Sequence, residues 1–564
     1  MSLPYNTTTT DAVPGEAAAY ALALSLLGSL ALALSAQWPG IVSPFTVNDD
    51  VRQQLFWTQR WFEPGLYSKD LLGDYSRLYV SWGVQGLYWF GALFMNTLAF
   101  SKWVAIALLT SQGVLLFMLV RMMLGQATGL LALGLFWLMP CYLENISGGL
   151  ARAFAAPLLT LFLYSLVSRR RWLALAALLG QALFIPYILP ICLGTACLHF
   201  AAWRLGLERT APLLRSLLDL LLAGLALGLA MAWQGQMGAA DFGPLPWASE
   251  MVGRPEFGPQ GRYPILPVPS LAWELVGRPL GSLAPFREIG PWAGAATLCT
   301  LVPLMGLGAW RLGRSGFRRL DPVLGYGLLA SVFLYFMARV VLLKLFIPSR
   351  YLEYTANVLL CVVLALLLSE VLLPALRHRS RAFGSAFLAL AFVLGAVRQH
   401  GLELYDYSEP RALYEAVRRL PLNACVAGDP ELMDNVLTFG HRNVYITAEL
   451  AHPWSQGYWS QASARLEGIL KAYYASDPEE VRRYCARVGI DFLVVDKRHF
   501  TREYMTAKHL FEPYSTAMRK RADDPAPYAL LLDSLPGSFV DDNVRIINLR
   551  KLQAGSPAAA ESSF

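Results

Sequence analysis

Charged residues are scarce in this chain of 564 residues: only 15% are Asp, Glu, Lys or Arg, whereas 55% are hydrophobic. Soluble domains carry about 25% charged residues, so the chain is too poor in charge to be soluble along its whole length. The shortage is local, because uncharged apolar runs dominate from Glu16 to Val397 and mixed composition begins at Arg398. We therefore predict one membrane domain followed by one globular domain of about 160 residues.

The seven cysteines lack any CxxC or Cys/His spacing. Most of them lie in apolar runs, where a thiol packs as a small hydrophobic group. Only Cys425 and Cys485 fall in the globular domain. The sequence leaves open whether these two form a disulfide, which would need an oxidising compartment.

No Lys or Arg precedes the first apolar run, which follows Asp11 and Glu16 and is therefore unlike a cleaved signal peptide. The Arg residues behind the net charge of +7 cluster in short loops between apolar runs. This pattern sets the orientation of a membrane protein, so we expect membrane lipid and not nucleic acid as a partner.

About 20 apolar residues are needed to cross a bilayer, and about eleven stretches qualify. The stretches are 17–36, 103–121, 126–143, 149–167, 172–186, 188–203, 214–233, 291–310, 322–342, 352–373 and 383–398. The predicted fold class is an α-helical polytopic membrane domain over residues 1–398 with a small α/β domain over 399–550.

One further apolar stretch, from Trp82 to Phe100, makes the count ambiguous. If this stretch does not cross, the loops on one side hold nearly all the Arg residues, and the positive-inside rule places that side in the cytoplasm. We therefore predict an interfacial helix there. The loops 37–102 and 234–290 and the C-terminal domain then face outward.

Two adjacent carboxylates, Asp49 and Asp50, follow the first span by about a dozen residues. Neighbouring carboxylates repel each other and lose hydration near lipid, so such a pair usually has a partner or a function. The alternative is an acidic turn that caps a helix starting near Val51. The pair alone leaves both interpretations open.

Further candidates for substrate binding lie in the outward loops and at the outward ends of later helices. They are Glu144, Arg152, Arg254, Arg262, Lys344, Arg350 and Tyr351. The guanidinium of Arg350 suits a lipid-linked phosphate, because it can contact two phosphate oxygens at once. Snorkelling of this side chain to the interface is the alternative.

The order of these features resembles that of glycosyltransferase superfamily C, the GT-C enzymes, over roughly residues 17–375. The resemblance lies in the early acidic pair, the interfacial segment GLYWFGALFMNTLAFSKW, the segments LLALGLFWLMPCYLEN and SRRRWLALAALLGQALFIPY, and the Arg-Tyr motif in IPSRYLEYT. Two features depart from the family pattern. Glu144-Asn145 stands at the second acidic position, and the WWDYG motif of oligosaccharyltransferases is absent.

The resemblance implies transfer of a sugar from a polyprenyl-phosphate-linked donor to a glycan, lipid or protein acceptor, outside the bacterial inner membrane. Asp49 or Asp50 would be the single carboxylate base of an inverting reaction, and Arg350 would contact the phosphate. The one cofactor that the resemblance leaves open is a divalent cation, Mg²⁺ or Mn²⁺, held by Asp49, Asp50 and Glu144.

The C-terminal domain alternates short strands and helices. NACVAGD, NVYIT and IDFLVVD read as strands, with the last as a buried parallel strand, and SARLEGILKAYYA and PEEVRRYCARVG read as helices. Asp429 and Asp496 end strands, where they either bind a ligand or start a turn. The aromatic segment 441–459 fits a glycan surface or a face packed on the membrane domain. The tail 551–564 is predicted to be disordered.

Two other functions remain open at this point. A flippase or transporter for a lipid-linked glycan needs ionisable residues along its path, for which Asp219 and Arg339, both near helix ends, are the main candidates. The sequence shows no internal repeat of the kind common in transporters. An assembly protein that kept the GT-C fold and lost catalysis is the third reading.

Overall fold

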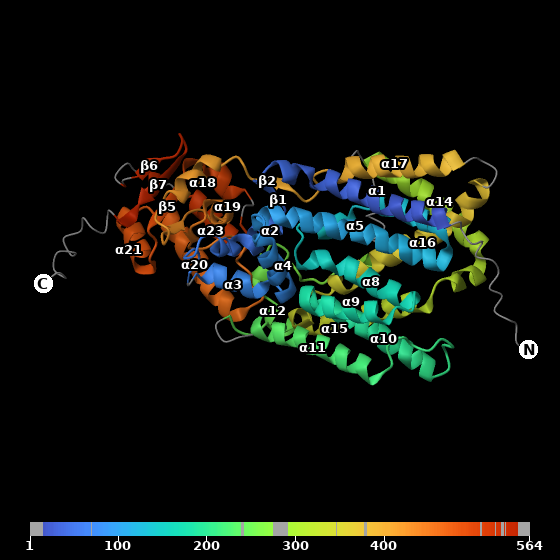
Figure 1. Cartoon of the computed structure of the whole chain (residues 1–564). Coiled ribbons are helices and arrows are strands. Elements are labelled where there is room, and N and C mark those ends of the chain that lie inside the picture. Colours follow the sequence, from blue (N-terminus) through green and yellow to red (C-terminus); the bar gives the residue numbers. More distant parts are fainter. Residues whose placement is uncertain are drawn as a thin grey trace, which may run out of the picture.

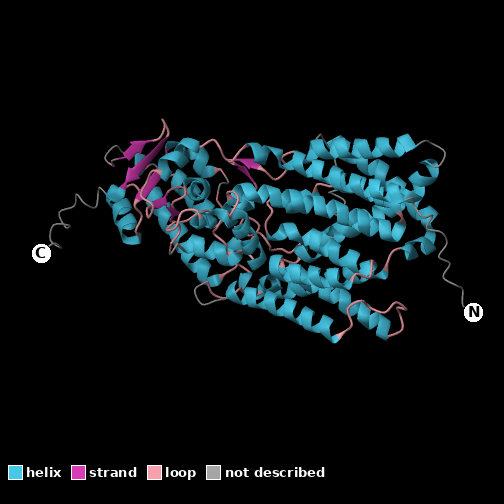
Figure 2. Cartoon of the chain, viewed as in Figure 1, coloured by secondary structure: helices cyan, strands magenta, loops and turns pink. Residues whose placement is uncertain are grey.

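The computed structural model describes residues 15–68, 70–237, 242–274, 291–345, 347–376, 381–507, 510–524, 526–531, 535 and 537–550. Long helices form a bundle at one end of the molecule, and a small α/β domain covers the other end (Figure 1). The strands gather in that domain, except for one short pair beside the bundle (Figure 2). The predicted fold class, a polytopic helical membrane domain with a C-terminal α/β domain, is confirmed.

Although the predicted span 126–143 also reaches α7 (Cys141–Ile146) and 149–167 also includes η2 (Ala151–Phe154), each predicted span overlaps one long helix of the described chain. These helices are α1 (Gly15–Val42), α5 (Thr97–Leu124), α6 (Gln126–Leu138), α8 (Ala155–Val167), α9 (Arg171–Phe184), α10 (Leu189–Arg204), α11 (Leu217–Met237), α14 (Pro291–Gly316), α15 (Pro322–Val341), α16 (Ser349–Leu376) and α17 (Arg381–Gln399). Six helices in the described residues are long and apolar enough to cross a membrane, and four more are apolar but shorter. The number of crossings therefore stays a prediction.

Small residues allow the central helices to approach closely. α5 packs along α1, α6 and α8, and α16 packs against α6, α14 and α15. At the crossing of α1 and α5, a Cβ on Gly113 would lie 2.2 Å from the Ser29 hydroxyl oxygen, so only glycine fits. Close approach at small residues stabilises helix pairs in a bilayer, where lipid competes with apolar side chains.

The two ionisable residues that transport would need have structural partners at helix ends. Asp219 lies in the first turn of α11, where it accepts from Arg171 at 2.6 Å and from the Ser216 hydroxyl at 2.7 Å. Arg339, in the last turn of α15, donates to the Pro269 carbonyl at 3.3 Å. Both contacts fix helix ends.

The segment from Trp82 to Phe100 does not form one continuous helix. Its helix α4 (Trp82–Ala92) has 11 residues, which gives a length of about 16 Å, too short to cross a bilayer. The chain then turns, and Asn96 caps α5, which starts at Thr97, earlier than the predicted 103. The exposed Trp89 and Phe90 give α4 the apolar side that a helix at a lipid surface needs.

The remaining short elements lie between the bundle and the α/β domain. They are β1 (Thr46–Val47), α2 (Asp49–Leu55), η1 (Phe56–Trp61), α3 (Leu71–Tyr79), α7 (Cys141–Ile146), η2 (Ala151–Phe154), η3 (Pro186–Ile188), α12 (Ala248–Met251), η4 (Pro255–Phe257) and η7 (Leu342–Leu345), with η6 (Phe317–Arg319) between α14 and α15. Several of them meet at the cavity described below.

The α/β domain holds a five-stranded sheet in the order β4-β3-β5-β7-β6. The strands are β3 (Cys425–Ala427), β4 (Asn443–Val444), β5 (Phe492–Asp496), β6 (Gly537–Phe539) and β7 (Val544–Asn548). β3 pairs in parallel with β4 and β5, whereas β7 pairs antiparallel with both β5 and β6. The predicted buried strand is β5, parallel on one side only.

Helices cover this sheet. They are α18 (Arg411–Arg418), α19 (Pro430–Gly440), α20 (Gln456–Tyr473), α21 (Pro478–Val488), α22 (Arg502–Thr506) and α23 (Tyr514–Ala522), with η8 (Lys497–Phe500) and η9 (Ala529–Leu531). Asp429 caps α19 and Asp496 caps η8, so both act as turn residues. Cys425 and Cys485 are free thiols. The tail 551–564 lies outside the described residues.

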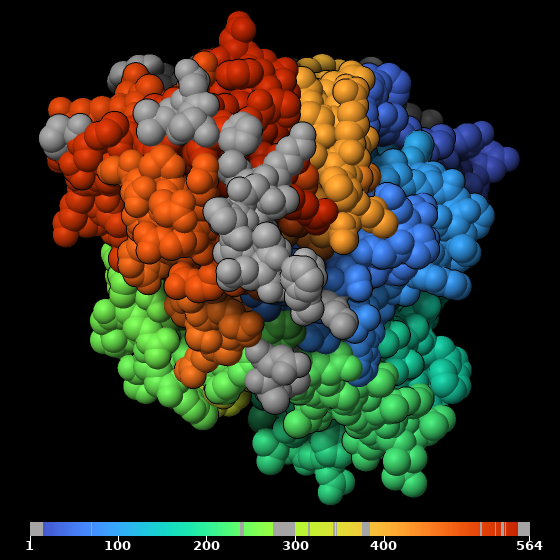
Figure 3. All heavy atoms as spheres, turned by 90° about the vertical axis from the view of Figure 1, so that its left-hand side faces the viewer, coloured from blue at the N-terminus to red at the C-terminus, as the bar shows by residue number. Residues whose placement is uncertain are grey.

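Two connections join the α/β domain to segments 37–102 and 234–290 of the bundle. β1, just after α1, pairs antiparallel with β2 (Tyr405–Asp406) at the start of the domain. The segment 242–274 lies against α20, and Figure 3 shows it in light green beside the orange surface of the domain. In that contact Tyr458 N–H donates to the Phe242 carbonyl at 2.9 Å.

This second contact depends on two glycines. A Cβ on Gly457 would lie 2.7 Å from the Phe242 carbonyl carbon, and one on Gly243 would lie 2.6 Å from the Gly457 nitrogen. We expect Gly457→Val to lower the temperature of thermal unfolding, with a loss of about 1–3 kcal/mol from the forced separation. Gly86→Ala, in open space on α4, is the control. Equal unfolding temperatures of the two variants would contradict the close contact.

A buried carboxyl predicts a pH effect on stability. Asp70 caps α3 by accepting from Gly73 N–H at 2.8 Å, and burial raises its pKa from 3.8 to about 6. A raised pKa favours the protonated folded state, so the stability contributed by this group decreases as pH rises from about 4 to 6, by up to about 3 kcal/mol. Asp70→Asn keeps the cap and removes the charge. We expect it to flatten thermal stability over this range, unlike the control Asp74→Asn.

Candidate functional site

A cavity of about 710 Å³ lies where the helix bundle meets the α/β domain. Its lining includes seven of the residues predicted from the sequence: Asp49, Asp50, Arg152, Arg262, Lys344, Arg350 and Tyr351. The other two lie elsewhere. Glu144 is exposed on α7, and Arg254 precedes η4, and neither is among the described residues that line the cavity.

The acidic pair stands in the first turn of α2. The helix cap is Asn48, whose side-chain oxygen accepts from Asp50 N–H at 3.2 Å. Gly148 makes room for this cap, since a Cβ there would lie 2.7 Å from the Asn48 oxygen. The carboxylates of Asp49 and Asp50 are thus not used for capping and turn to other partners.

Each carboxylate of the pair has its own guanidinium partner. Asp49 accepts from Arg52, one turn along α2, and from the Tyr407 hydroxyl at 3.2 Å. Asp50 pairs with Arg152 of η2 at 3.0 Å, and both of these side chains are about 30% exposed, at the cavity. The two acids are therefore held in different ways, one by its own helix and one across the cavity.

Arg350 is fixed on the bundle side of the cavity. At the start of α16 it donates to Glu353 at 2.9 Å and to the Asn145 side-chain oxygen at 3.2 Å. Asn145 also donates to Glu353 at 2.8 Å. Since α7 carries Asn145, this network ties α7 to α16 and holds the guanidinium at the wall. The hydroxyl of Tyr351 points to the Leu345 carbonyl.

Lys344 lies at the same end of the bundle. Its ammonium nitrogen is 4.9 Å from the centre of the Trp247 ring, a cation–π contact. Its backbone carbonyl accepts from Gln234 of α11 at 2.7 Å. Across the described chain no carboxylate pairs with Lys344, so its charge is available to an anion in the cavity.

The α/β domain and the segment 242–274 form the opposite side of the cavity. Arg262 donates to the carboxylate of Glu449 at 2.7 Å and to the carbonyls of Glu449 and Ala448 at 2.5 and 3.1 Å. Gln53 of α2 donates to Glu449 at 2.9 Å. Glu449 thus joins three parts of the chain.

Aromatic rings surround these polar groups. Trp454 stacks on His452 at 4.0 Å and meets Tyr263 edge-on at 4.5 Å. Burial and the nearby Arg262 lower the pKa of His452 well below 6.5, so this imidazole is neutral. The aromatic segment of the domain therefore both packs on segment 242–274 and lines the cavity.

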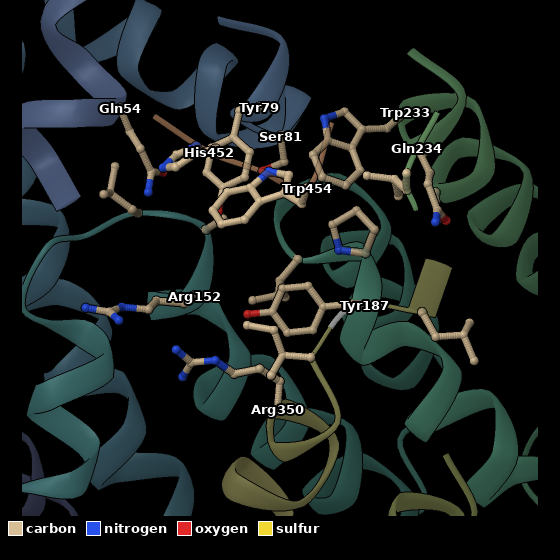
Figure 4. A pocket seen from close by; sticks show the side chains of 18 of the residues that line it. Gln54, Tyr79, Ser81, Arg152, Tyr187, Trp233, Gln234, Arg350, His452 and Trp454 are labelled. Carbon is tan, nitrogen blue, oxygen red and sulfur yellow. The ribbon is translucent and has the colours of Figure 1, made fainter. Parts of the chain in front are cut away.

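Figure 4 shows the two sides of the cavity facing each other. Arg152, Arg350 and Tyr187 lie on one side, and Tyr79, His452 and Trp454 lie on the other. A third wall is apolar and belongs largely to α11. It consists of Leu227, Ala230, Met231 and Trp233, together with Leu345 and Ile347. One cavity thus offers cations, carboxylates and an apolar wall.

The three carboxylates considered as ligands of a divalent cation do not fit that role. Asp49 and Asp50 are each paired with an arginine, and Glu144 is exposed away from the cavity lining. Among the described residues, no group of three or more His, Cys, Asp or Glu side chains could hold a metal ion.

Arg152, the partner of Asp50, was predicted from the sequence, whereas Arg52 and Tyr407, the partners of Asp49, were not. Arg52 stands three residues after Asp49, a spacing that brings side chains together on a helix, and this signal was available. The same spacing joins Arg350 and Glu353. Tyr407 gave no local signal, because it reaches Asp49 from far along the chain.

The contacts of Arg262 with Glu449 and Ala448 hold the cavity wall that the α/β domain forms with segment 242–274, and this can be tested. Replacing Arg262 with Gln removes an ion pair and two bonds to carbonyls, each worth about 1.5–3 kcal/mol when charged. We expect backbone amides of 255–268 and 447–452 to exchange hydrogen at least about tenfold faster, measured by mass spectrometry. Arg254→Gln, in the same segment, is the control. Unchanged exchange in Arg262→Gln would show that the contact does not hold the segment.

Comparison with known proteins gives likeness in structure and none in sequence. No family model and no curated protein matches the chain. The structure is similar to that of ArnT from Cupriavidus metallidurans in the apo state, with 12% identity, coverage of 94% of this chain and 98% of that chain, and a TM-score of 0.51.

Two archaeal structures were also found. An Archaeoglobus fulgidus oligosaccharyltransferase tethered with an acceptor peptide is 15% identical, covering 86% of this chain and 70% of that one, with a TM-score of 0.49. AglB from the same organism, in complex with an inhibitory peptide and a dolichol-phosphate, is 14% identical over the same shares, with a TM-score of 0.48. ArnT, an aminoarabinose transferase, is a GT-C glycosyltransferase. On the likeness to ArnT, this chain has the GT-C fold.

Proposed function

We propose that the chain is a membrane glycosyltransferase that moves a sugar from a polyprenyl-phosphate-linked donor to an acceptor hydroxyl. One observation carries the proposal: Asp49 and Asp50 share a cavity with Arg152, Lys344 and Arg350 on a GT-C fold. Sugar transfer from a phosphate needs a base for the acceptor and cations for the leaving group, and this cavity offers both.

The wall of α11 supports a lipid-linked donor. Leu227 and Met231 of this wall can contact a polyprenyl chain, while the cations lie where its phosphate would be. Lys344, which pairs with no carboxylate of the described residues, offers its charge to the phosphate, and Arg350, fixed by Glu353, presents a planar group for two oxygens. A free nucleotide sugar would leave the apolar wall without a partner.

We assign the base to Asp50. Asp49 is occupied by Arg52 and Tyr407, whereas the partner of Asp50 is Arg152, itself a lining residue of the cavity. When the donor phosphate attracts Arg152, the Asp50 carboxylate becomes free to accept a proton. Of the two acids in this helix turn, Asp50 is thus the base, and Asp49 stays paired with Arg52 and Tyr407.

The reaction needs a single base. Asp50 takes the proton of the acceptor hydroxyl. The hydroxyl oxygen then attacks the anomeric carbon of the donor sugar. The bond from that carbon to the phosphate oxygen breaks, and the phosphate leaves with the electron pair, its charge met by Arg350 and Lys344. The phosphate needs no proton, so one carboxylate suffices and the anomeric configuration inverts.

We place the cavity and the α/β domain outside the bacterial inner membrane. The Arg-rich loops, such as residues 169–171 between α8 and α9, support a cytoplasmic location of the other end of the bundle. The acceptor, a glycan, lipid or protein, would then enter from the α/β domain.

The test measures release of undecaprenyl phosphate by mass spectrometry from purified protein in nanodiscs. The donors are undecaprenyl-phosphate-linked hexoses, pentoses and N-acetylhexosamines, and the acceptor is an extract of bacterial envelope. We expect Asp50→Asn to lower the rate at least about 100-fold, as loss of a general base does. Asp49→Asn should lose less, and the control Asp74→Asn, outside the cavity, nothing.

Measuring the binding of undecaprenyl phosphate shows whether a variant has lost turnover or has lost binding of the lipid phosphate. Asp50→Asn should still bind it, while Arg350→Gln should bind at least about tenfold more weakly, because charge-assisted contacts are lost. Full turnover in Asp50→Asn would refute the base. No binding or turnover by the wild-type protein would refute the donor class.

A further inference from the structure

We infer that Arg52 is the positioning residue of the acidic pair, and that through it the α/β domain orients the base. Arg52 holds Asp49 in a fixed, charge-compensated state and leaves Asp50 as the acid that reacts. The inference rests on the proposed function, because it explains how the two acids divide their roles.

The two terminal nitrogens of the Arg52 guanidinium each have a hydrogen-bond partner. The guanidinium donates to Asp49 and, at 2.6 Å, to the side-chain oxygen of Asn435. Its central carbon lies 4.1 Å above the ring of Tyr407, whose hydroxyl donates to the same Asp49 oxygen. Arg52 is only 7% exposed, so none of these contacts is a loose surface pair.

Two of these partners come from beyond the bundle. Asn435 belongs to α19 of the α/β domain, and Tyr407 follows β2, the strand that pairs with β1. Thr438, also on α19, donates to the Arg52 carbonyl at 2.9 Å. The domain therefore contacts both the side chain and the backbone of Arg52 in α2, one turn from the acidic pair.

The positive charge of Arg52 also affects the electrostatic surroundings of Asp50. With Arg52 present, the charge of Asp49 is compensated beside Asp50. Without it, Asp49 would be a bare negative charge at the next position, and a neighbouring like charge raises the pKa of a carboxyl. The other titratable or charged groups that face the pair are Tyr79, Arg152, Tyr263, Glu403 and Tyr405. Asp434 of α19 faces Arg52 itself, and Arg350 lies near Arg152.

The test is the pH profile of kcat/KM for release of undecaprenyl phosphate, with the donor that the wild-type protein turns over fastest. We expect Arg52→Gln to lower kcat at least about tenfold and to move the acidic limb up by about one pH unit. Adding Asp49→Asn to this variant removes the bare charge, so the acidic limb should return to its wild-type position.

Two milder variants separate geometry from charge. Arg52→Lys keeps the charge but cannot form the planar fork to Asp49 and Asn435, so kcat should decrease while the acidic limb stays in place. Asn435→Ala should behave in the same way, which tests the link to the α/β domain. Arg411→Gln, an exposed arginine of α18 paired with Glu415, is the matched control. Thermal unfolding of each variant checks that it is folded.

The outcomes are distinct. If the Arg52 variants keep the wild-type kcat and pH profile while Asp50→Asn is inactive, the inference fails and the proposed function stands. If the acidic limb of the pH profile lies at the same pH in Arg52→Gln and in the double variant with Asp49→Asn, Arg52 has only a structural role and the inference also fails. Full activity of Asp50→Asn, or no turnover by the wild-type protein, overturns both.

Discussion

Two adjacent carboxylates at the boundary between the helix bundle and the α/β domain are the constraint on which this structure depends. Partly buried charges are costly unless they are paired, and neighbouring like charges add repulsion. Asp49 and Asp50 meet this constraint with two separate arginines, one within α2 and one from η2. The segments between the bundle and the α/β domain meet the domain around these pairs.

The same arrangement makes the α/β domain a part of the site. Glu449 and Trp454 line the cavity from the domain, and Asn435 reaches the arginine beside the acidic pair. The bundle supplies Arg350 and the apolar wall of α11. Neither part alone encloses the cavity, so the boundary near residue 398 divides the sequence by composition and does not divide the site.

Most of the correct predictions came from local patterns in the sequence. Apolar runs located the helices, and seven residues that line the cavity were predicted because cations and acids near helix ends are conspicuous among apolar residues. Contacts between distant segments were beyond reach: Arg52 with Asn435, and the pair β1–β2, join residues more than 350 positions apart. Glu144 was chosen over its neighbour Asn145, which binds Arg350, because an amide gives no signal of charge.

The pairing of β1 with β2 has a consequence for how the protein is made. A ribosome produces Thr46 and the acidic pair early, but the partners of this region, from Tyr405 to Thr438, emerge only after the last helix of the bundle. Until then α2 lacks both Tyr407 and α19, and the cavity lacks one side. A growing chain therefore completes its helices first, and the cavity can close only after the α/β domain has been made.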